Sequence, residues 1–188
     1  MKGNKSAVRL LYTAAIFIAS AVILCAVFAS LLAPYDPSAV SPEEILEHSS
    51  AAHWLGTDAL GRDILSRVIY GARSSVAFAF CSAFCTMALG LSLGMVSGYF
   101  GGLADKSVQC LVALFQGLPG TSLMIAIAAI LPENDFRIII ALTLTSWTGF
   151  SRIVRNEVLR IKGETYMEGI RSIGAGHRYI LRKYIFPN

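Results

Sequence analysis

The chain has 188 residues, of which 55% are hydrophobic and 15% are charged. Soluble domains carry about 25% charged residues on average, so this composition argues against an ordinary soluble domain and indicates a membrane protein. The net charge of +4 is distributed between long apolar stretches and forms no separate soluble face, so nucleic-acid binding is not expected.

The first apolar stretch predicts a membrane-spanning helix over residues 10–32, after a short cationic head at residues 1–9. A spanning helix needs about 20 apolar residues, and no charged residue occurs between Arg9 and Asp36. A cleaved signal peptide is the alternative, but its apolar core would have about 7–15 residues. The longer run favours a helix that remains part of the protein.

Residues 33–75 are predicted to form an extramembrane segment with short helices. Ser41, followed by Pro and two Glu, indicates a helix start, because acidic side chains stabilise the N-terminal end of a helix. Gly56 and Gly61 flank Thr57 and Asp58, a pattern typical of a turn, and an amphipathic helix follows. We expect the charged residues of this turn to stabilise it and to cap the helix rather than to perform catalysis: these are Asp58, Arg62 and Asp63.

Three further apolar stretches predict spanning helices, at residues 76–98, 107–131 and 138–154. In the first of them, small residues such as Gly90 and Gly94 permit close helix packing. The last is short for a span, but Arg152 and Arg155 at its end can reach the membrane interface with their charged groups or lie within the helix bundle. Together with the first helix, these stretches predict four spans.

Two glycine-containing stretches interrupt this pattern. Residues 97–105 are predicted to form a tight turn. A phosphate-binding loop is the alternative for a Gly-rich stretch, but no strand precedes these residues and no Gly-Lys-Ser/Thr motif is present. Gly117-Leu118-Pro119 interrupts the stretch at residues 107–131. Proline in a spanning helix frees backbone carbonyls, which can line a cavity or a moving joint. A kink that packing tolerates is the alternative, and it is the interpretation that we favour.

The distribution of Lys and Arg predicts the orientation of the chain. If all four helices span, most basic residues lie on the same side as the N-terminus, which is then the cytoplasmic side. The opposite side holds only Arg62, Arg67, Arg73 and Arg137. We therefore expect a multi-pass protein of the cell (inner or plasma) membrane, in contact with membrane lipids.

The last residues, 160–188, are polar and cationic. Met167 and Ile170 begin an apolar pattern with a three-residue step, which predicts one face of a helix. Gly174 and Gly176 are expected to break that helix, and a second short helix follows before Pro187. Two short helices joined by a bend beside the membrane would offer a surface for a soluble partner, and an ordinary connecting loop is the alternative.

Several function classes lack the residues that they need. The predicted spans contain no Asp, Glu or His, which proton-coupled pumps use, and the chain has neither a His-Glu-x-x-His pair nor a Walker motif. The cysteines lie in apolar stretches, where Cys acts as a small hydrophobic residue: they are Cys25, Cys81, Cys85 and Cys110. We expect no enzyme, no metal site and no bound cofactor, and any energy for transport would come from a partner.

The C-terminal stretch resembles the EAA loop of the membrane subunits of ABC importers. Glu168, Gly174 and Pro187 fall at the Glu, Gly and Pro of that pattern, whereas Gly169 and Ile170 replace its two Ala. The remaining departures are Tyr184 for Ile and Phe186 for Leu. The resemblance implies that this loop docks on an ATPase subunit, through Glu168, Gly169, Ile170, Gly174 and Pro187.

The extramembrane segment is similar to the signature of the dipeptide/oligopeptide/nickel permeases. Its pattern is His-x-Leu-Gly-Thr-Asp-x-x-Gly-Arg-Asp, followed by Ser-Arg and Tyr-Gly-Ala-Arg. The residues that fit it are His53, Leu55, Gly56, Thr57, Asp58, Gly61, Arg62, Asp63, Ser66, Arg67, Tyr70, Gly71, Ala72 and Arg73.

The resemblance implies an all-α integral membrane protein with a MetI-like ABC permease helix bundle, of which four of an expected six spans are present. It also implies a second homologous permease subunit, two ABC ATPase subunits and an extracytoplasmic substrate-binding protein. Peptides are favoured as the substrate over nickel or a metal chelate, and a non-transporting membrane anchor or assembly protein is the alternative of another class. Because the family's last two spans are absent, we expect that this chain cannot transport by itself.

Overall fold

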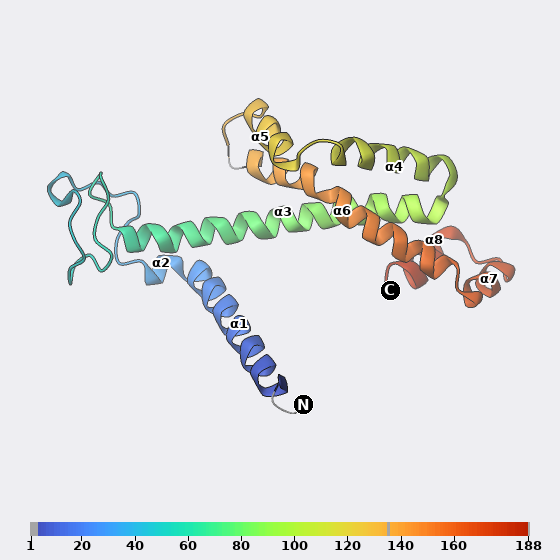
Figure 1. The fold of residues 1–188 in the computed structure, drawn as a ribbon, viewed down its shortest axis with the longest axis horizontal. Coiled ribbons are helices and arrows are strands. Elements are labelled where there is room, and N and C mark those ends of the chain that lie inside the picture. Colours follow the sequence, from blue (N-terminus) through green and yellow to red (C-terminus); the bar gives the residue numbers. More distant parts are fainter. Residues whose placement is uncertain (1–3, 135, 188) are drawn as a thin grey trace. The chain divides into compact units, whose positions relative to one another are not determined.

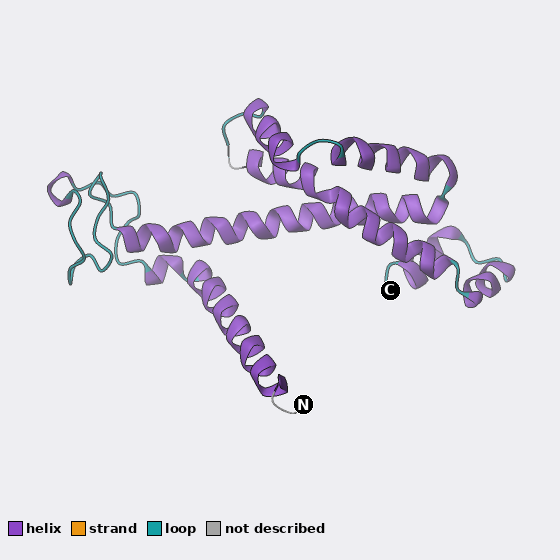
Figure 2. Cartoon of the chain, in the orientation of Figure 1, coloured by secondary structure: helices purple, strands orange, loops and turns teal. Residues whose placement is uncertain are grey.

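The computed structural model describes residues 4–134 and 136–187 of the chain. Most of the described residues are helical, and they contain no strand (Figure 2), only an isolated antiparallel bridge between Thr57 and Asp63. The all-α prediction is therefore confirmed. The chain divides into two compact units, Met1–Ala79 and Phe80–Asn188.

The first unit begins with two consecutive helices, α1 (Asn4–Val27) and α2 (Ala29–Leu32) (Figure 1). They cover the predicted span at residues 10–32, and residues 1–3 of the predicted cationic head lie outside the described residues. Most apolar side chains of α1 are exposed. This is the pattern of a helix whose apolar surface faces lipid.

Helix α3 (Ile64–Phe100) is continuous over 37 residues. At about 1.5 Å per residue it is about 55 Å long, which exceeds the hydrocarbon core of about 30 Å. The sequence predicted an amphipathic helix after Asp63 and a separate span at residues 76–98, whereas the structure joins them. No Pro occurs between the two stretches, and the single Gly71 costs only about 1 kcal/mol in a helix.

The second unit contains the C-terminal part of α3 and the remaining helices, which Figure 1 shows in yellow to red. These are α4 (Gly102–Gln116), α5 (Gly120–Ile130), α6 (Phe136–Lys162), α7 (Thr165–Ser172), α8 (His177–Ile180) and the π-helical turn η2 (Leu181–Ile185). As predicted, α3 and α4 are joined by a tight glycine turn, in which Gly101 and Gly102 have φ values of 68° and 54°.

The interruption at Gly117-Leu118-Pro119 is larger than the tolerated kink that we favoured. Helices α4 and α5 are bent by 92° at this break. Pro119 has no backbone N–H, and it disfavours helical angles at the residue before it. The apolar stretch at residues 107–131 therefore forms two helices rather than one straight span.

By length and composition, two of the described helices can cross a membrane, Val8–Val27 and Ile64–Phe100, and the bent α4–α5 pair would be a third. Helix α6 covers the predicted fourth span at residues 138–154 but does not qualify by these criteria. It begins next to Arg137 and has Arg152 and Arg155 within its second half. The count of four spans stays a prediction.

Helices α3 and α6 pack closely because glycine lines their contact. A Cβ atom added at Gly94 would lie 2.6 Å from the backbone oxygen of Ser151, and one at Gly98 would lie 2.8 Å from Cβ of Val158. At Gly90 the nearest atoms would be 3.0 Å away, on Trp147 and Phe150. The three glycines recur every four residues, so they share one face of α3. The predicted role of Gly90 and Gly94 in helix packing is confirmed.

The interior of the second unit consists of two apolar clusters. One joins α4 to α6 through Val108, Val112 and Trp147, with Phe115 and Trp147 in an edge contact at a centroid distance of 5.8 Å. The other lies where α3 and α6 meet the C-terminal helices. It positions the candidate site.

Candidate functional site

The candidate site is the C-terminal helical segment, which we define as residues 165–187, from α7 to the turn after η2. Its inner face packs against α3 and α6: Met167, Ile180 and Ile185 are at most 4% exposed. The cluster that they form is completed by Tyr99, Val158 and Ile161. This packing holds the segment against α3 and α6, although Met167 and Ile180 are more than ten positions apart in the sequence.

The bend between α7 and α8 forms as predicted. Helix α7 ends at Ser172, and Gly174 has a φ of 81°, in the left-handed region that favours glycine. The N–H groups of Gly174 and Ala175 donate to the carbonyl oxygens of Arg171 and Ile170, at 2.9 and 3.3 Å. These bonds close the end of α7, so the bend is part of the folded segment.

Four of the five predicted docking residues are exposed: Glu168, Gly169, Gly174 and Pro187. Ile170 is half-buried and packs against the cluster beneath the segment. A Cβ atom at Gly169 would meet nothing within 4 Å, so packing within the described chain does not require glycine there. Among the described residues, no hydrogen-bond donor contacts the carboxylate of Glu168, whose backbone oxygen accepts from Ser172.

The outer face of α8 and η2 is cationic and aromatic. Arg178, Tyr179, Arg182, Lys183 and Pro187 line a surface groove of about 590 Å³. The Lys183 ammonium donates to the Tyr179 hydroxyl at 2.8 Å, which raises the pKa of Lys183 and lowers that of Tyr179. Such a face suits an acidic partner surface, since guanidinium and ammonium groups bind carboxylates.

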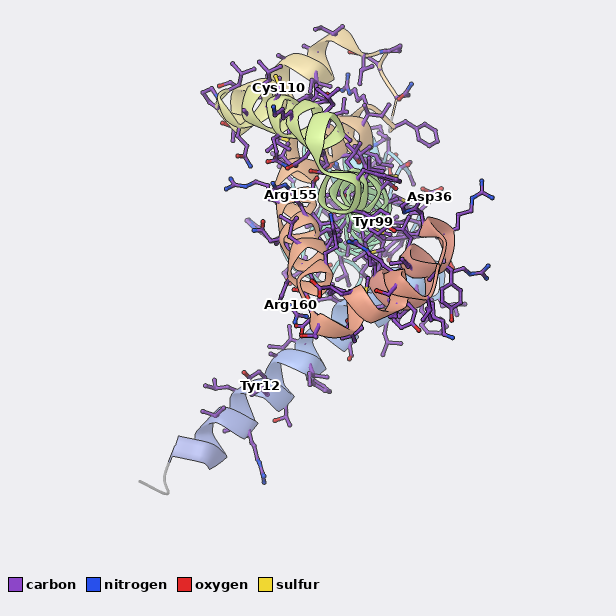
Figure 3. The ribbon with its side chains drawn as sticks, turned by 90° about the vertical axis from the view of Figure 1, so that its right-hand side faces the viewer. Tyr12, Asp36, Tyr99, Cys110, Arg155 and Arg160 are labelled. Atoms are coloured by element: carbon purple, nitrogen blue, oxygen red, sulfur yellow. The ribbon has the colours of Figure 1, made fainter. Side chains whose placement is uncertain are left out.

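The segment is also connected to α3 by polar contacts that the sequence did not indicate. The Tyr99 hydroxyl and Nδ1 of His177 share a hydrogen bond of 2.8 Å. Lys162, at the end of α6, donates to the backbone oxygens of Tyr99 and Gly98 at 2.7 and 3.2 Å. Burial, followed by the nearby charge of Arg171, lowers the pKa of Lys162. Figure 3 labels Tyr99, at the end of α3.

A second polar network ties the turn between α3 and α4 to α6. Arg155 donates two hydrogen bonds to Asp105, at 2.7 and 2.6 Å, and the Ser97 hydroxyl donates to the same carboxylate. Gln109 in turn donates to the Ser97 hydroxyl at 3.3 Å. The sequence predicted that Arg155 reaches the membrane interface or lies in the helix bundle, but not that it pairs with Asp105, because this partner lies 50 positions away in the chain.

In the extramembrane segment, two glycines are required by the fold of the turn. Gly56 and Gly61 have φ values of 75° and 72°. Cβ atoms at these positions would lie 2.4 Å from the backbone oxygen of Glu47 and 1.9 Å from that of Ser41. Any larger residue would therefore collide with the backbone. Ser41 itself precedes the short 3-10 helix η1 (Pro42–Glu44), where the sequence predicted a helix start.

The charged residues of the turn stabilise it, as predicted. The carboxylate of Asp58 accepts from the backbone N–H groups of Leu60 and Arg62, at 2.8 and 3.1 Å. It also pairs with the guanidinium of Arg62 at 2.8 Å and with that of Arg67. The bond from Arg62 is the main reason that the pKa of Asp58 lies well below its usual range.

Asp63 joins the turn to α3. One of its oxygens accepts from the Ser66 backbone N–H at 2.7 Å, which caps the helix, and the other lies 3.0 Å from Nδ1 of His53. His53 is 4% exposed, and its ring lies against that of Tyr35 at a centroid distance of 4.7 Å. The bond to Asp63 raises the pKa of His53. Burial acts to raise the pKa of Asp63, but the bonds from Ser66 and His53 outweigh it and lower the value.

The signature residues thus form a set of internal contacts. The hydroxyl of Thr57 donates to the backbone oxygen of Glu44 and accepts from the N–H of Glu47 at 2.9 Å. Arg73 is exposed on α3 and forms no hydrogen bond or ion pair with the other signature residues in the described part of the chain. The four cysteines are free and exposed, and no group of three or more metal-binding side chains occurs among the described residues.

Exposed apolar helices and a glycine-lined helix contact are the features of a helical integral membrane protein. Residues 90–188 match the family described as "Binding-protein-dependent transport system inner membrane component". The chain belongs to this family, as the sequence predicted.

Curated relatives agree with the family. The chain is 35% identical over 167 residues to the oligopeptide transport system permease protein OppC of Bacillus subtilis, covering 89% of this chain and 55% of the relative. It is 36% identical over 188 residues to the dipeptide transport system permease protein DppC of the same organism, covering 100% and 57%. It is 38% identical over 176 residues to the glutathione transport system permease protein GsiD of Escherichia coli O157:H7, covering 93% and 58%. The chain therefore spans 55–58% of the length of these relatives.

Proposed function

We propose that the chain is a permease subunit of an ABC importer for peptides, which forms half of a translocation path and is driven by a separate ATPase. The observation that carries this proposal is the C-terminal helical segment. Its inner face is packed on α3 and α6, whereas Glu168, Gly169 and Gly174 remain exposed on its outer side. A rigid segment with an open outer face can transmit the closure of a partner as rigid-body motion.

The exposed docking residues suit close contact with a partner. Gly169 has open space where a side chain would be, so a partner's backbone can approach there. The Glu168 carboxylate has no partner among the described residues, and it is the only acidic side chain of α7. Ile170 contributes from beneath, by holding α7 on the cluster that contains Met167. In this proposal the C-terminal helical segment is the docking segment of the chain, and Pro187 ends it.

The proposal includes further partners. These are a second homologous permease, two ATPase subunits, an extracytoplasmic substrate-binding protein and the lipids of the cell membrane. The excess of Lys and Arg after residue 151 supports a cytoplasmic N-terminus and C-terminal segment. The extramembrane segment at residues 33–75 would then face the substrate-binding protein.

Peptides are the proposed substrates because the three relatives described above are named for oligopeptides, dipeptides and glutathione. Nickel or a metal chelate is the alternative that the signature at His53–Arg73 leaves open. A direct comparison of labelled dipeptide and nickel uptake distinguishes the two.

The test replaces Glu168 by Lys in the transporter that contains this chain. We expect Glu168→Lys to abolish co-purification of the ATPase and ATP-dependent uptake of dipeptide. Glu133→Lys is the matched control, because the Glu133 side chain is 94% exposed in the loop before α6. This variant should leave ATPase co-purification and dipeptide uptake unchanged. ATPase binding without uptake by the wild type would instead support a membrane anchor, and normal ATPase binding by Glu168→Lys would contradict the docking role.

A further inference from the structure

Three side chains from different elements meet at the last turn of α3. Lys162 of α6 donates to the backbone oxygens of Gly98 and Tyr99, and His177 of α8 bonds to the Tyr99 hydroxyl. We call Tyr99, Lys162 and His177 the junction. All three belong to the same compact unit, Phe80–Asn188.

The central residue of the junction, Tyr99, lies in the core, whereas Lys162 is half-buried and His177 is exposed. Tyr99 is 5% exposed and shares a cluster with Met167 of α7 and Ile180 of α8. Its ring meets that of His177 edge-on at a centroid distance of 5.6 Å, and the Lys162 ammonium lies 5.8 Å from its centroid. One aromatic side chain therefore bonds to α8, lies near the Lys162 ammonium at the end of α6 and shares a core cluster with α7.

Lys162 contributes to the junction through backbone groups. The last carbonyls of a helix lack intrahelical partners and carry partial negative charge, so an ammonium group stabilises them. Lys162 bonds to two carbonyls at the end of α3 from a position at the end of α6. It thus ties the C-terminal ends of two long helices to each other at the base of the docking segment.

We infer that this junction transmits movement of the docking segment to α3, with Tyr99, Lys162 and His177 as positioning residues for transport. The inference rests on the proposed function and names the side chains through which the ATPase would act. A close-packed core does not deform continuously, so a shift of α7 and α8 must either carry Tyr99 and α3 with it or break these contacts. Ile180 and Met167 supply the packing, and the polar bonds fix the register.

The chain offers a matched control two positions from Lys162. The guanidinium of Arg160 also forms hydrogen bonds at the end of α6, but its partners are Glu157 and Glu164, in the same stretch of chain. Arg160 is exposed, and breaking these bonds leaves the junction in place. A difference between Lys162→Met and Arg160→Met therefore measures the connection to α3 and not the loss of a cationic side chain as such.

The experiment uses the intact transporter, purified with its partners and reconstituted in vesicles. The variants are Tyr99→Phe, His177→Ala and Lys162→Met, and the control is Arg160→Met. For each, three quantities are measured: co-purification of the ATPase, the rate of ATP hydrolysis and the amount of dipeptide transported per ATP. The last quantity reports coupling, which a variant that merely folds less well would not change, because both rates would fall together.

We expect the three junction variants to retain the ATPase but to transport at least about threefold less dipeptide per ATP, and Arg160→Met to match the wild type. The double variant with Tyr99→Phe and His177→Ala should transport no less dipeptide per ATP than the stronger single variant, because both changes remove the same hydrogen bond. An unchanged ratio in all three variants, with the ATPase bound, would overturn the inference and leave the proposed function standing. A wild-type transporter that binds no ATPase would refute both.

Discussion

Replacing Gly94 by Ala tests whether the contact between α3 and α6 determines the stability of the second unit. The added Cβ atom would lie 2.6 Å from the backbone oxygen of Ser151 and 2.8 Å from Cβ of Val154. Both neighbours belong to α6, and one is backbone, so the helices must move apart. Overpacking of this kind costs about 1–3 kcal/mol, while the better helix propensity of Ala returns at most about 1 kcal/mol. We expect a net loss of about 1–2 kcal/mol.

Thermal unfolding in detergent measures this loss. For a chain of this length, 1 kcal/mol corresponds to a shift of about 2–4 °C, so Gly94→Ala should lower the midpoint by about 2–8 °C. Gly149→Ala is the control, because Gly149 lies in α6 and a Cβ atom there would meet nothing within 4 Å. We expect that variant to equal or exceed the wild type. Equal shifts for the two variants would show that the close contact at Gly94 does not limit stability.

Two further predictions concern polar contacts. His53 is paired with Asp63, which raises its pKa above the ordinary 6.5. The pairing should stabilise the extramembrane segment fully below about pH 6.5, and this stabilisation should be lost as the pH rises through the raised pKa of His53. The segment should therefore be cleaved by a protease faster at pH 9 than at pH 6, and His53→Gln should abolish this pH dependence. Arg155→Lys removes the two-point bond to Asp105 and should lower the free energy of unfolding by about 1–2 kcal/mol. Arg160→Lys, at an exposed pair within α6, is the control and should change the unfolding midpoint little. Equal effects of the two variants would contradict a special role of the Arg155 bond.

Local sequence patterns predicted the parts of the structure that depend on neighbouring residues. The glycine bend at Gly174 and the glycine turn after α3 could be predicted because their backbone angles are favourable mainly for glycine. The turn held by Asp58 could be predicted because its partners lie within nine positions. In each case the deciding contacts are close in sequence, so a short stretch contains the information.

Where the sequence predictions fell short, the result depends on distance or on competition between elements. His177 lies 78 positions from Tyr99, and Lys162 lies 63 from it, so no local pattern indicates that they meet. The continuity of α3 depends on the absence of any strong helix breaker between residues 64 and 76, which a search for separate apolar and amphipathic stretches does not test. The break at Pro119 was located from sequence, but its angle of 92° depends on how α5 packs against α6.

The signature residues of the extramembrane turn and the predicted docking residues of the C-terminal helical segment differ in how their polar atoms are paired. This difference distinguishes residues that stabilise the fold from residues that are free to bind a partner. In the extramembrane turn, the carboxylates of Asp58 and Asp63 each accept several hydrogen bonds from within the chain. These residues are accounted for by folding alone. The Glu168 carboxylate is exposed and without a partner among the described residues, although α7 beneath it is firmly packed through Met167. A charged group held in place by a packed helix but left open on its outer side is suited to a partner, which is why charge reversal at Glu168 should abolish binding of the ATPase while the fold is retained.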